Sequence, residues 1–159
     1  MSGSSYPCSI FAQYRMIRDI YVLLEDGDRR VLNRFNLTPS QYEVLSLLDI
    51  EESQRLTMLS ERLLCARSTI TRIIDQLEQA GLVRRITDAD DRRAQRVMLT
   101  PAGAALLQRA RSSHRDSLVS RISVLSEGEN RQLDQLLNKL HRGLRAQLDA
   151  NGEVGELDC

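Results

Sequence analysis

The sequence predicts a mainly α-helical protein that contains one short β-hairpin. Aromatic residues make up only 4% of the 159 residues and Trp is absent, which favours helices packed through aliphatic side chains over a β-sandwich. Apolar residues recur at helical spacing near both ends of the chain. Two runs of β-forming residues, 82–86 and 95–100, flank a polar loop and are predicted to pair as an antiparallel hairpin.

The length is sufficient for one sizeable hydrophobic core. Basic and acidic residues number 22 each, so the net charge gives no support to nucleic-acid binding, and any such case depends on the local distribution of charge. All of the basic residues except Lys139 are arginines. This preference suits the recognition of phosphates and base edges, but a codon bias would produce it equally well.

The first predicted helix begins near Ile10. Its apolar side chains are spaced by three or four residues and form one stripe that needs a partner surface: Ile10, Phe11, Tyr14, Ile17, Tyr21 and Leu24. The segment "EDGD" at 25–28 interrupts this stripe, which predicts that the helix kinks or ends near Gly27.

Three later helices have recognisable start signals. The segment "TPSQ" at 38–41 has the Thr, Pro and Gln of a capping box and predicts a helix through 42–50. The segment "TPAG" at 100–103 repeats the Thr-Pro start, and "SEGE" at 126–129 has the Ser and Glu of another capping box. The helix after 103 is expected to use a set of apolar positions: Ala105, Leu106, Ala110, Leu118 and Ile122.

Between these signals, residues 57–80 predict two helices in quick succession. Thr57 is expected to cap the first helix, which runs to about Leu64, and Ser68 the second. Gly81 is placed to end the second helix in the left-handed conformation. The inward face of that helix is expected to hold Ile70, Ile73, Ile74 and Leu77. Two turn-linked helices followed by a hairpin indicate a winged helix-turn-helix, whose second helix enters the major groove of DNA.

The local charge agrees with this use. Three arginines and no acid lie between Arg62 and Arg72, at the front of the second helix, where free backbone N–H groups also favour phosphate. We expect Ser68, Arg72 and Asp75 to point outward, flanked by Thr71 and Gln76. These side chains can hydrogen-bond base edges and phosphates. The alternative is that they form the ordinary polar face of an amphipathic helix.

At the C-terminal end, a near-heptad leucine stripe predicts a further helix: Leu133, Leu136, Leu137, Leu140, Leu144 and Leu148. The segment "NGEVGELDC" that follows is rich in Gly and acids, so it is expected to be mobile.

Several of these stretches together resemble the MarR family of bacterial transcription regulators: "LTPSQYEVLSLL", "LTMLSERLLCARSTITRIIDQLEQAGLVRR" and "DADDRRAQRVMLTPAG". The resemblance covers about residues 10–148, with the motifs in the order and spacing of that family. Its most specific element is "DDRRAQRVMLTPAG", which is similar to the wing signature of the family, whereas "LEQAGLV" occurs in many winged helices.

The resemblance implies a homodimer that presents two winged helices to a pseudo-palindromic double-stranded DNA operator. It also implies regulation, usually repression, relieved by cysteine oxidation or by a small phenolic ligand, for which we expect a site at the junction of the dimerisation and DNA-binding regions. The domains would be an N-terminal dimerisation helix (8–36), the winged helix-turn-helix (37–100), C-terminal dimerisation helices (101–149) and a mobile acidic tail (150–159).

The resemblance also assigns roles to individual residues. At the start of the recognition helix, the expected DNA contacts are Arg67, Ser68, Thr69, Thr71 and Arg72. At the wing tip they are Arg92 and Arg93, which would reach the minor groove, and Asp91 would steady the wing loop.

Two other functions compete with this interpretation. One is a winged-helix protein-interaction module that never touches DNA, which the neutral net charge supports a little. The other is an enzyme, for which the sequence offers little: His114 and His141 are the only histidines, both are interpreted as helix-surface residues, and there is no phosphate loop or metal-ligand pair. We therefore expect no catalytic residue, no metal and no cofactor.

The cysteines Cys8, Cys65 and Cys159 are too far apart in the sequence, and odd in number, for a disulfide framework. Cys65 is a candidate redox sensor because Arg62 and Arg67 lie near it in the sequence, although a buried and inert thiol is the stronger interpretation. The sequence shows neither a long apolar run nor a signal peptide, so a cytoplasmic protein is expected.

Overall fold

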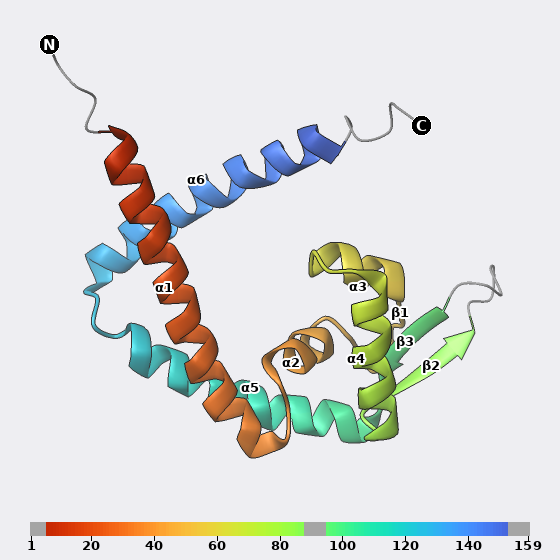
Figure 1. The fold of residues 1–159 in the computed structure, drawn as a ribbon. Coiled ribbons are helices and arrows are strands. Elements are labelled where there is room, and N and C mark those ends of the chain that lie inside the picture. Colours follow the sequence, from red (N-terminus) through yellow and green to blue (C-terminus); the bar gives the residue numbers. More distant parts are fainter. Residues whose placement is uncertain (1–5, 88–94, 153–159) are drawn as a thin grey trace, which may run out of the picture. The chain divides into compact units, whose positions relative to one another are not determined.

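The computed structural model describes residues 6–87 and 95–152 (Figure 1). The chain divides into two compact units, Met1–Ser117 and Leu118–Cys159. The elements follow in the order α1 (Tyr6–Leu32), η1 (Asn33–Phe35), α2 (Pro39–Ser46), β1 (Gln54–Arg55), α3 (Leu56–Arg62), α4 (Arg67–Gln79), β2 (Val83–Thr87), β3 (Gln95–Leu99), α5 (Pro101–Ile122) and α6 (Glu127–Gly152).

Helix α1 continues through Gly27, so the expectation that it ends there is wrong. Two ion pairs at i,i+4 spacing support this part of the helix. Arg29 Nη2 lies 3.5 Å from Glu25 Oε1, and Arg30 Nε lies 2.7 Å from Asp26 Oδ2. These pairs and the burial of the last turn of α1 offset the cost of about 1 kcal/mol that Gly carries in a helix.

The predicted capping boxes are confirmed. The backbone N–H of Gln41 donates to Thr38 Oγ1 at 3.2 Å, and the backbone N–H of Thr38 donates to Gln41 Oε1 at 3.0 Å. At α6, the Ser126 N–H donates to Glu129 Oε2 at 2.8 Å, and hydrogen bonds from Ser126 lower the pKa of the Glu129 carboxyl. Helix α2 ends at Ser46, however, earlier than predicted, and the N–H groups of Leu47 and Leu48 then donate to Val44 O and Leu45 O, both at 3.1 Å.

The predicted caps Thr57 and Ser68 are wrong. Helix α3 begins at Leu56 and α4 at Arg67, and neither N-cap residue supplies a side-chain hydrogen bond. Between the two helices, Leu64 adopts a left-handed conformation with φ of 49°. The two N–H groups that follow α3 still satisfy its last carbonyls: Leu64 N–H donates to Glu61 O at 3.3 Å and Cys65 N–H to Ser60 O at 3.1 Å.

Gly81 ends α4 as predicted, with φ of 72°. Its N–H donates to Glu78 O and that of Leu82 to Leu77 O, both at 2.9 Å, which completes a Schellman motif. The predicted hairpin is confirmed, with β2 antiparallel to β3. The sequence did not reveal β1, which pairs with the other edge of β3, so the sheet has three strands in the order β1-β3-β2.

The core lies among α2, α3, α4 and the sheet, and it includes the four predicted residues of α4, Ile70, Ile73, Ile74 and Leu77. The start of α5 packs on the end of α4: Thr100 N–H donates to Leu82 O at 3.0 Å, and Thr100 Oγ1 donates to Gly81 O at 2.7 Å. On α5 the buried positions are Gly103, Leu107 and Ala110, whereas the predicted Ala105 is exposed.

Both terminal helices expose apolar side chains in the single chain. On α1, Phe11 is 68% exposed and Tyr14 58%; on α6, Leu136 is 59% exposed and Leu144 52%. Exposed apolar patches of this kind mark interaction surfaces. Among the helices of residues 6–87 and 95–152, none is long and apolar enough to cross a membrane.

Candidate nucleic-acid interface

The end of α3 and the front of α4 carry exposed positive charge. Arg62, Arg67 and Arg72 are all exposed, and none of them forms an ion pair within residues 6–87 and 95–152. The backbone N–H groups of the first turn of α4 add partial positive charge at the same end. Arginines that lie near a helix N-terminus and have no carboxylate partner among the described residues favour phosphate, so this surface can receive a polyanion.

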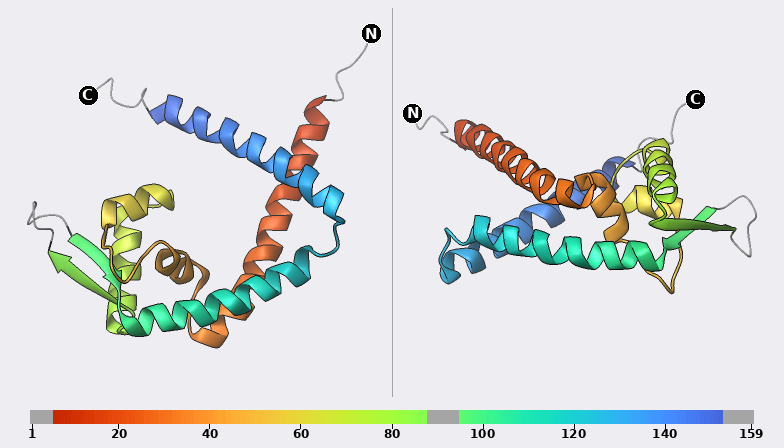
Figure 2. Two further views of the ribbon diagram at one scale, coloured as in Figure 1. Left: turned by 180° about the vertical axis from the view of Figure 1, so that it is seen from behind. Right: turned by 90° about the horizontal axis from the view of Figure 1, so that it is seen from below.

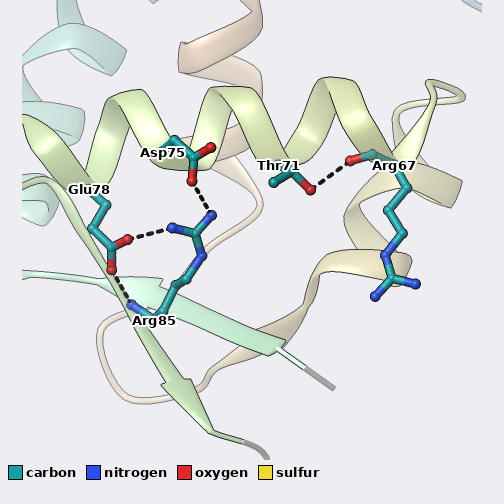
Figure 3. A network of polar contacts seen from close by, with 5 residues as sticks. All are labelled: Arg67, Thr71, Asp75, Glu78 and Arg85. Carbon is teal, nitrogen blue, oxygen red and sulfur yellow. Dashed lines mark hydrogen bonds and ion pairs between the residues drawn. The ribbon is translucent and has the colours of Figure 1, made fainter. Parts of the chain in front are cut away.

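The other residues expected at this end of α4 differ in how accessible they are. Ser68 is exposed, whereas Thr69 and Thr71 are half-buried. Thr71 Oγ1 donates to Arg67 O at 3.0 Å, and the Arg67 side chain points away from the helix (Figure 3). The hydroxyl proton of Thr71 is therefore engaged, and its oxygen remains available only as an acceptor.

Asp75 and Gln76 are both exposed, as predicted, but each already contacts a residue of another element. Asp75 Oδ1 lies 2.6 Å from Arg85 Nη2, and Gln76 Oε1 accepts a hydrogen bond from Gln41 Nε2 at 3.2 Å. These two side chains are therefore already engaged by neighbouring elements, whereas the exposed arginines of α4, Arg67 and Arg72, lie in its N-terminal half.

Arg85 is a further residue of this region, and it was not predicted from the sequence. It lies on β2, on the strand face that also carries the buried Val83. Its guanidinium contacts both Asp75 and Glu78 of α4 (Figure 3). A signal was present in the sequence: two acids at i,i+3 on one helix precede an arginine at an inward-facing strand position.

The hairpin β2–β3 extends beyond α3 and α4 in both views of Figure 2. Its expected tip residues Asp91, Arg92 and Arg93 lie outside the described residues. The strands on either side of this segment are described, and Thr87 of β2 is in register with Gln95 of β3.

Cys65 lies in the turn between α3 and α4, where it is half-buried and packs against the hydrophobic core. This position agrees with the interpretation of Cys65 as a structural thiol. The side chain of Cys8 and the whole of Cys159 lie outside the described part of the chain.

The interpretation of His114 as a helix-surface residue is wrong, whereas His141 is exposed as predicted. The His114 side chain is only 15% exposed, its Nε2 lies 3.0 Å from Asp28 Oδ1, and its ring lies 4.9 Å from that of Tyr42. Asp28 also acts on Glu43, whose pKa is raised mainly by burial and further by the charges of Asp28 and Glu25. A cluster of titratable groups therefore joins α1, α2 and α5.

Comparisons with known proteins agree with this geometry. The MarR family model matches residues 37–94. The chain is 31% identical over 126 residues to the transcriptional regulator MhqR of Bacillus subtilis, covering 79% of this chain and 86% of MhqR. It is 29% identical to the regulator PecS of Dickeya dadantii, covering 79% of this chain and 77% of PecS.

Solved structures show the same fold. A mutant of MarR from E. coli, complexed with operator DNA, superposes with a TM-score of 0.77 at 24% identity and covers 86% of this chain and 99% of its own. The regulator BldR of Sulfolobus solfataricus superposes with a TM-score of 0.75 at 28% identity, and the match covers 87% of this chain and 99% of BldR. The MepR–DNA complex of S. aureus superposes with a TM-score of 0.75 at 24% identity, and the match covers 82% of this chain and 96% of MepR.

Proposed function

The chain belongs to the MarR family of helix-turn-helix transcription regulators, and we propose that it represses transcription by binding a pseudo-palindromic operator as a homodimer. The observation that carries the proposal is a set of exposed arginines, Arg62 at the end of α3 and Arg67 and Arg72 of α4, which form no ion pair within the described residues. Two structural neighbours, from E. coli and S. aureus, are complexes with DNA, which supports the same use of this fold here.

In this proposal the N-terminal half of α4 enters the major groove. Arg72 contacts base edges, and Arg67 and Ser68 contact phosphates. Thr69 and Thr71 line the same turn of the helix. The wing arginines Arg92 and Arg93 reach the adjacent minor groove, where Asp91 orients them.

The apolar faces of α1 and α6 support the homodimer. Their exposed side chains, such as Phe11 and Leu136, are costly to leave in water, since burial of one such side chain contributes about 1.5–3 kcal/mol. A second copy of the chain would cover them, and it would also supply the second winged helix for the second half of the operator.

An electrophoretic shift tests the function directly. The probe is duplex DNA from upstream of the gene that encodes the protein, and the control is an unrelated duplex of the same length. We expect the upstream fragment to shift at protein concentrations at which the control does not. A winged-helix protein-interaction module, the second candidate that the neutral net charge favours, would shift neither duplex even at low salt.

Release by an effector is the finer part of the proposal. We propose that a small phenolic ligand or an oxidant lowers the affinity for DNA. Repeating the shift with peroxide on the wild type and on Cys65→Ser tests the cysteine: release of the wild type alone would identify Cys65 as the sensor. The partly buried position of Cys65 favours equal behaviour of the two proteins, in which case this thiol is structural.

A further inference from the structure

Arg85 links the wing to the recognition helix. Its Nη2 lies 2.6 Å from Asp75 Oδ1 and its Nη1 lies 2.5 Å from Glu78 Oε2, so one guanidinium bridges two carboxylates (Figure 3). The backbone N–H of Arg85 also donates to Glu78 Oε1 at 3.0 Å. Glu78 therefore holds both the side chain and the backbone of this residue, which fixes where β2 begins relative to α4.

The bridge also changes the charge that α4 presents. The side chains of Asp75 and Glu78 remain 59% and 39% exposed, on the helix that is proposed to enter DNA. Unshielded carboxylates there would repel phosphates. The Arg85 guanidinium is only 22% exposed and neutralises part of this charge. Although burial acts to lower the pKa of Arg85, its hydrogen bonds to Asp75 and Glu78 raise it overall, so the residue stays charged.

We propose that Arg85 is a positioning residue for DNA binding: it fixes the wing strands against α4 and shields Asp75 and Glu78 from the phosphates of the operator. This inference depends on the proposed DNA-binding function. Arg85 acts through its neighbours, because both terminal nitrogens already donate to carboxylates, its Nε is buried, and only 22% of its side chain is exposed to a phosphate.

The neighbouring Arg84 provides a matched control. It lies on the same strand but on the opposite face, in register with Met98, and it is exposed. It forms no ion pair within residues 6–87 and 95–152. Replacing it removes the same charge from the same strand without breaking the link to α4.

The experiment is a mutant cycle read by fluorescence anisotropy with the labelled upstream duplex. Its proteins are the wild type, Arg85→Gln, the pair Asp75→Asn with Glu78→Gln, and the combination of all three, with Arg84→Gln as the control. We expect Arg85→Gln to weaken DNA binding about tenfold or more in the wild-type background. In the background with both carboxylates neutralised, we expect the same substitution to weaken binding by less than about threefold. We expect Arg84→Gln to weaken DNA binding less than Arg85→Gln does.

The salt dependence separates positioning from direct contact. A lost phosphate contact lowers the slope of log affinity against log salt by about 0.9, and each contact occurs twice in a dimer. We expect the slope for Arg85→Gln to equal that of the wild type. Equal losses in both carboxylate backgrounds together with a lower slope would make Arg85 a direct DNA contact and overturn the proposal.

Folding is checked by circular dichroism and by the melting temperature of each variant. If Arg85→Gln does not fold, Arg85→Lys takes its place. Lysine keeps the positive charge but lacks the guanidinium that bonds two carboxylates at once, so a loss of DNA affinity is again expected. Unchanged affinity in a folded Arg85 variant would overturn the inference alone. A wild-type protein that binds neither the upstream nor an unrelated duplex at low salt would overturn the proposed function as well.

Discussion

The Cα atom of Gly103, in the first turn of α5, faces the backbone carbonyl of Leu82, and a Cβ atom built on it would lie 1.9 Å from that carbonyl oxygen. This close approach explains why the segment "TPAG" ends in Gly, because no side chain fits between the start of α5 and the end of α4. The same contact positions the hairpin, which lies between these two helices in the sequence.

Gly103→Ala is therefore expected to destabilise the protein by about 1–3 kcal/mol, because a backbone group must move. Thermal unfolding followed by circular dichroism measures this. Gly128→Ala in α6 is the control, since a Cβ there meets nothing within 4 Å and the helix tolerates Ala well. A Gly103→Ala protein as stable as the control would contradict the close packing of α4 on α5.

Leu64→Gly is expected to stabilise the protein by up to about 1 kcal/mol. Leu64 is 64% exposed and has φ of 49°, a conformation that Gly adopts without steric cost. Leu64→Ala removes the same exposed side chain but keeps the Cβ atom, so it separates the backbone effect from the loss of contacts. A melting temperature of the Gly variant at or below that of the Ala variant would show that the turn is unstrained.

Glu43→Gln is expected to stabilise the protein at pH 7 and to have little effect near pH 3. Burial, Asp28 and Glu25 raise the pKa of Glu43, so folding favours its protonated form. That contribution is fully present below the pKa of the unfolded chain and is lost as the pH rises through the higher folded pKa. The ionised group thus destabilises the fold at neutral pH, and Gln removes this penalty. Urea unfolding at the two pH values tests the sign, and a gain confined to low pH would contradict it.

Leu140→Glu is expected to convert the proposed dimer to a monomer, or to weaken it strongly, because it places a charge within the apolar stripe of α6, where Leu140 is 45% exposed. Gln135→Glu adds the same charge to an exposed position off the stripe. Sedimentation velocity distinguishes the two. A wild-type protein that is monomeric at micromolar concentration would remove the basis of the homodimer.

Much of the fold was predictable because its signals are local. The caps at Thr38 and Thr100, the left-handed Gly81 and the hairpin each depend on a few neighbouring residues. The failures have a different origin. Thr57 and Ser68 are good capping residues, but the chain enters both helices earlier, at positions that packing on the core and the strand β1 determine.

In the candidate site, too, some features were predictable from local sequence patterns and others were not. The exposed arginines at the front of α4 follow from the amphipathic pattern, because burial of the apolar face turns Arg67 and Arg72 outward. The neutralisation of Asp75 by Arg85 and the burial of His114 against Asp28 depend on residues distant in the sequence. The spacing of residues along one helix does not predict such contacts between separate elements.

The most direct test of the central claim is the affinity of Arg72→Ala for the upstream duplex, measured by anisotropy against a set of single base-pair variants of that duplex. Arg131→Ala is the control, because Arg131 pairs only with Glu127 in an exposed i,i+4 contact within the described residues. If Arg72 contacts a base edge, its loss removes about 1–3 kcal/mol of discrimination at particular positions and leaves the melting temperature nearly unchanged. A folded, dimeric Arg72→Ala protein with the affinity and sequence preference of the wild type would contradict the account that α4 is how this protein recognises DNA.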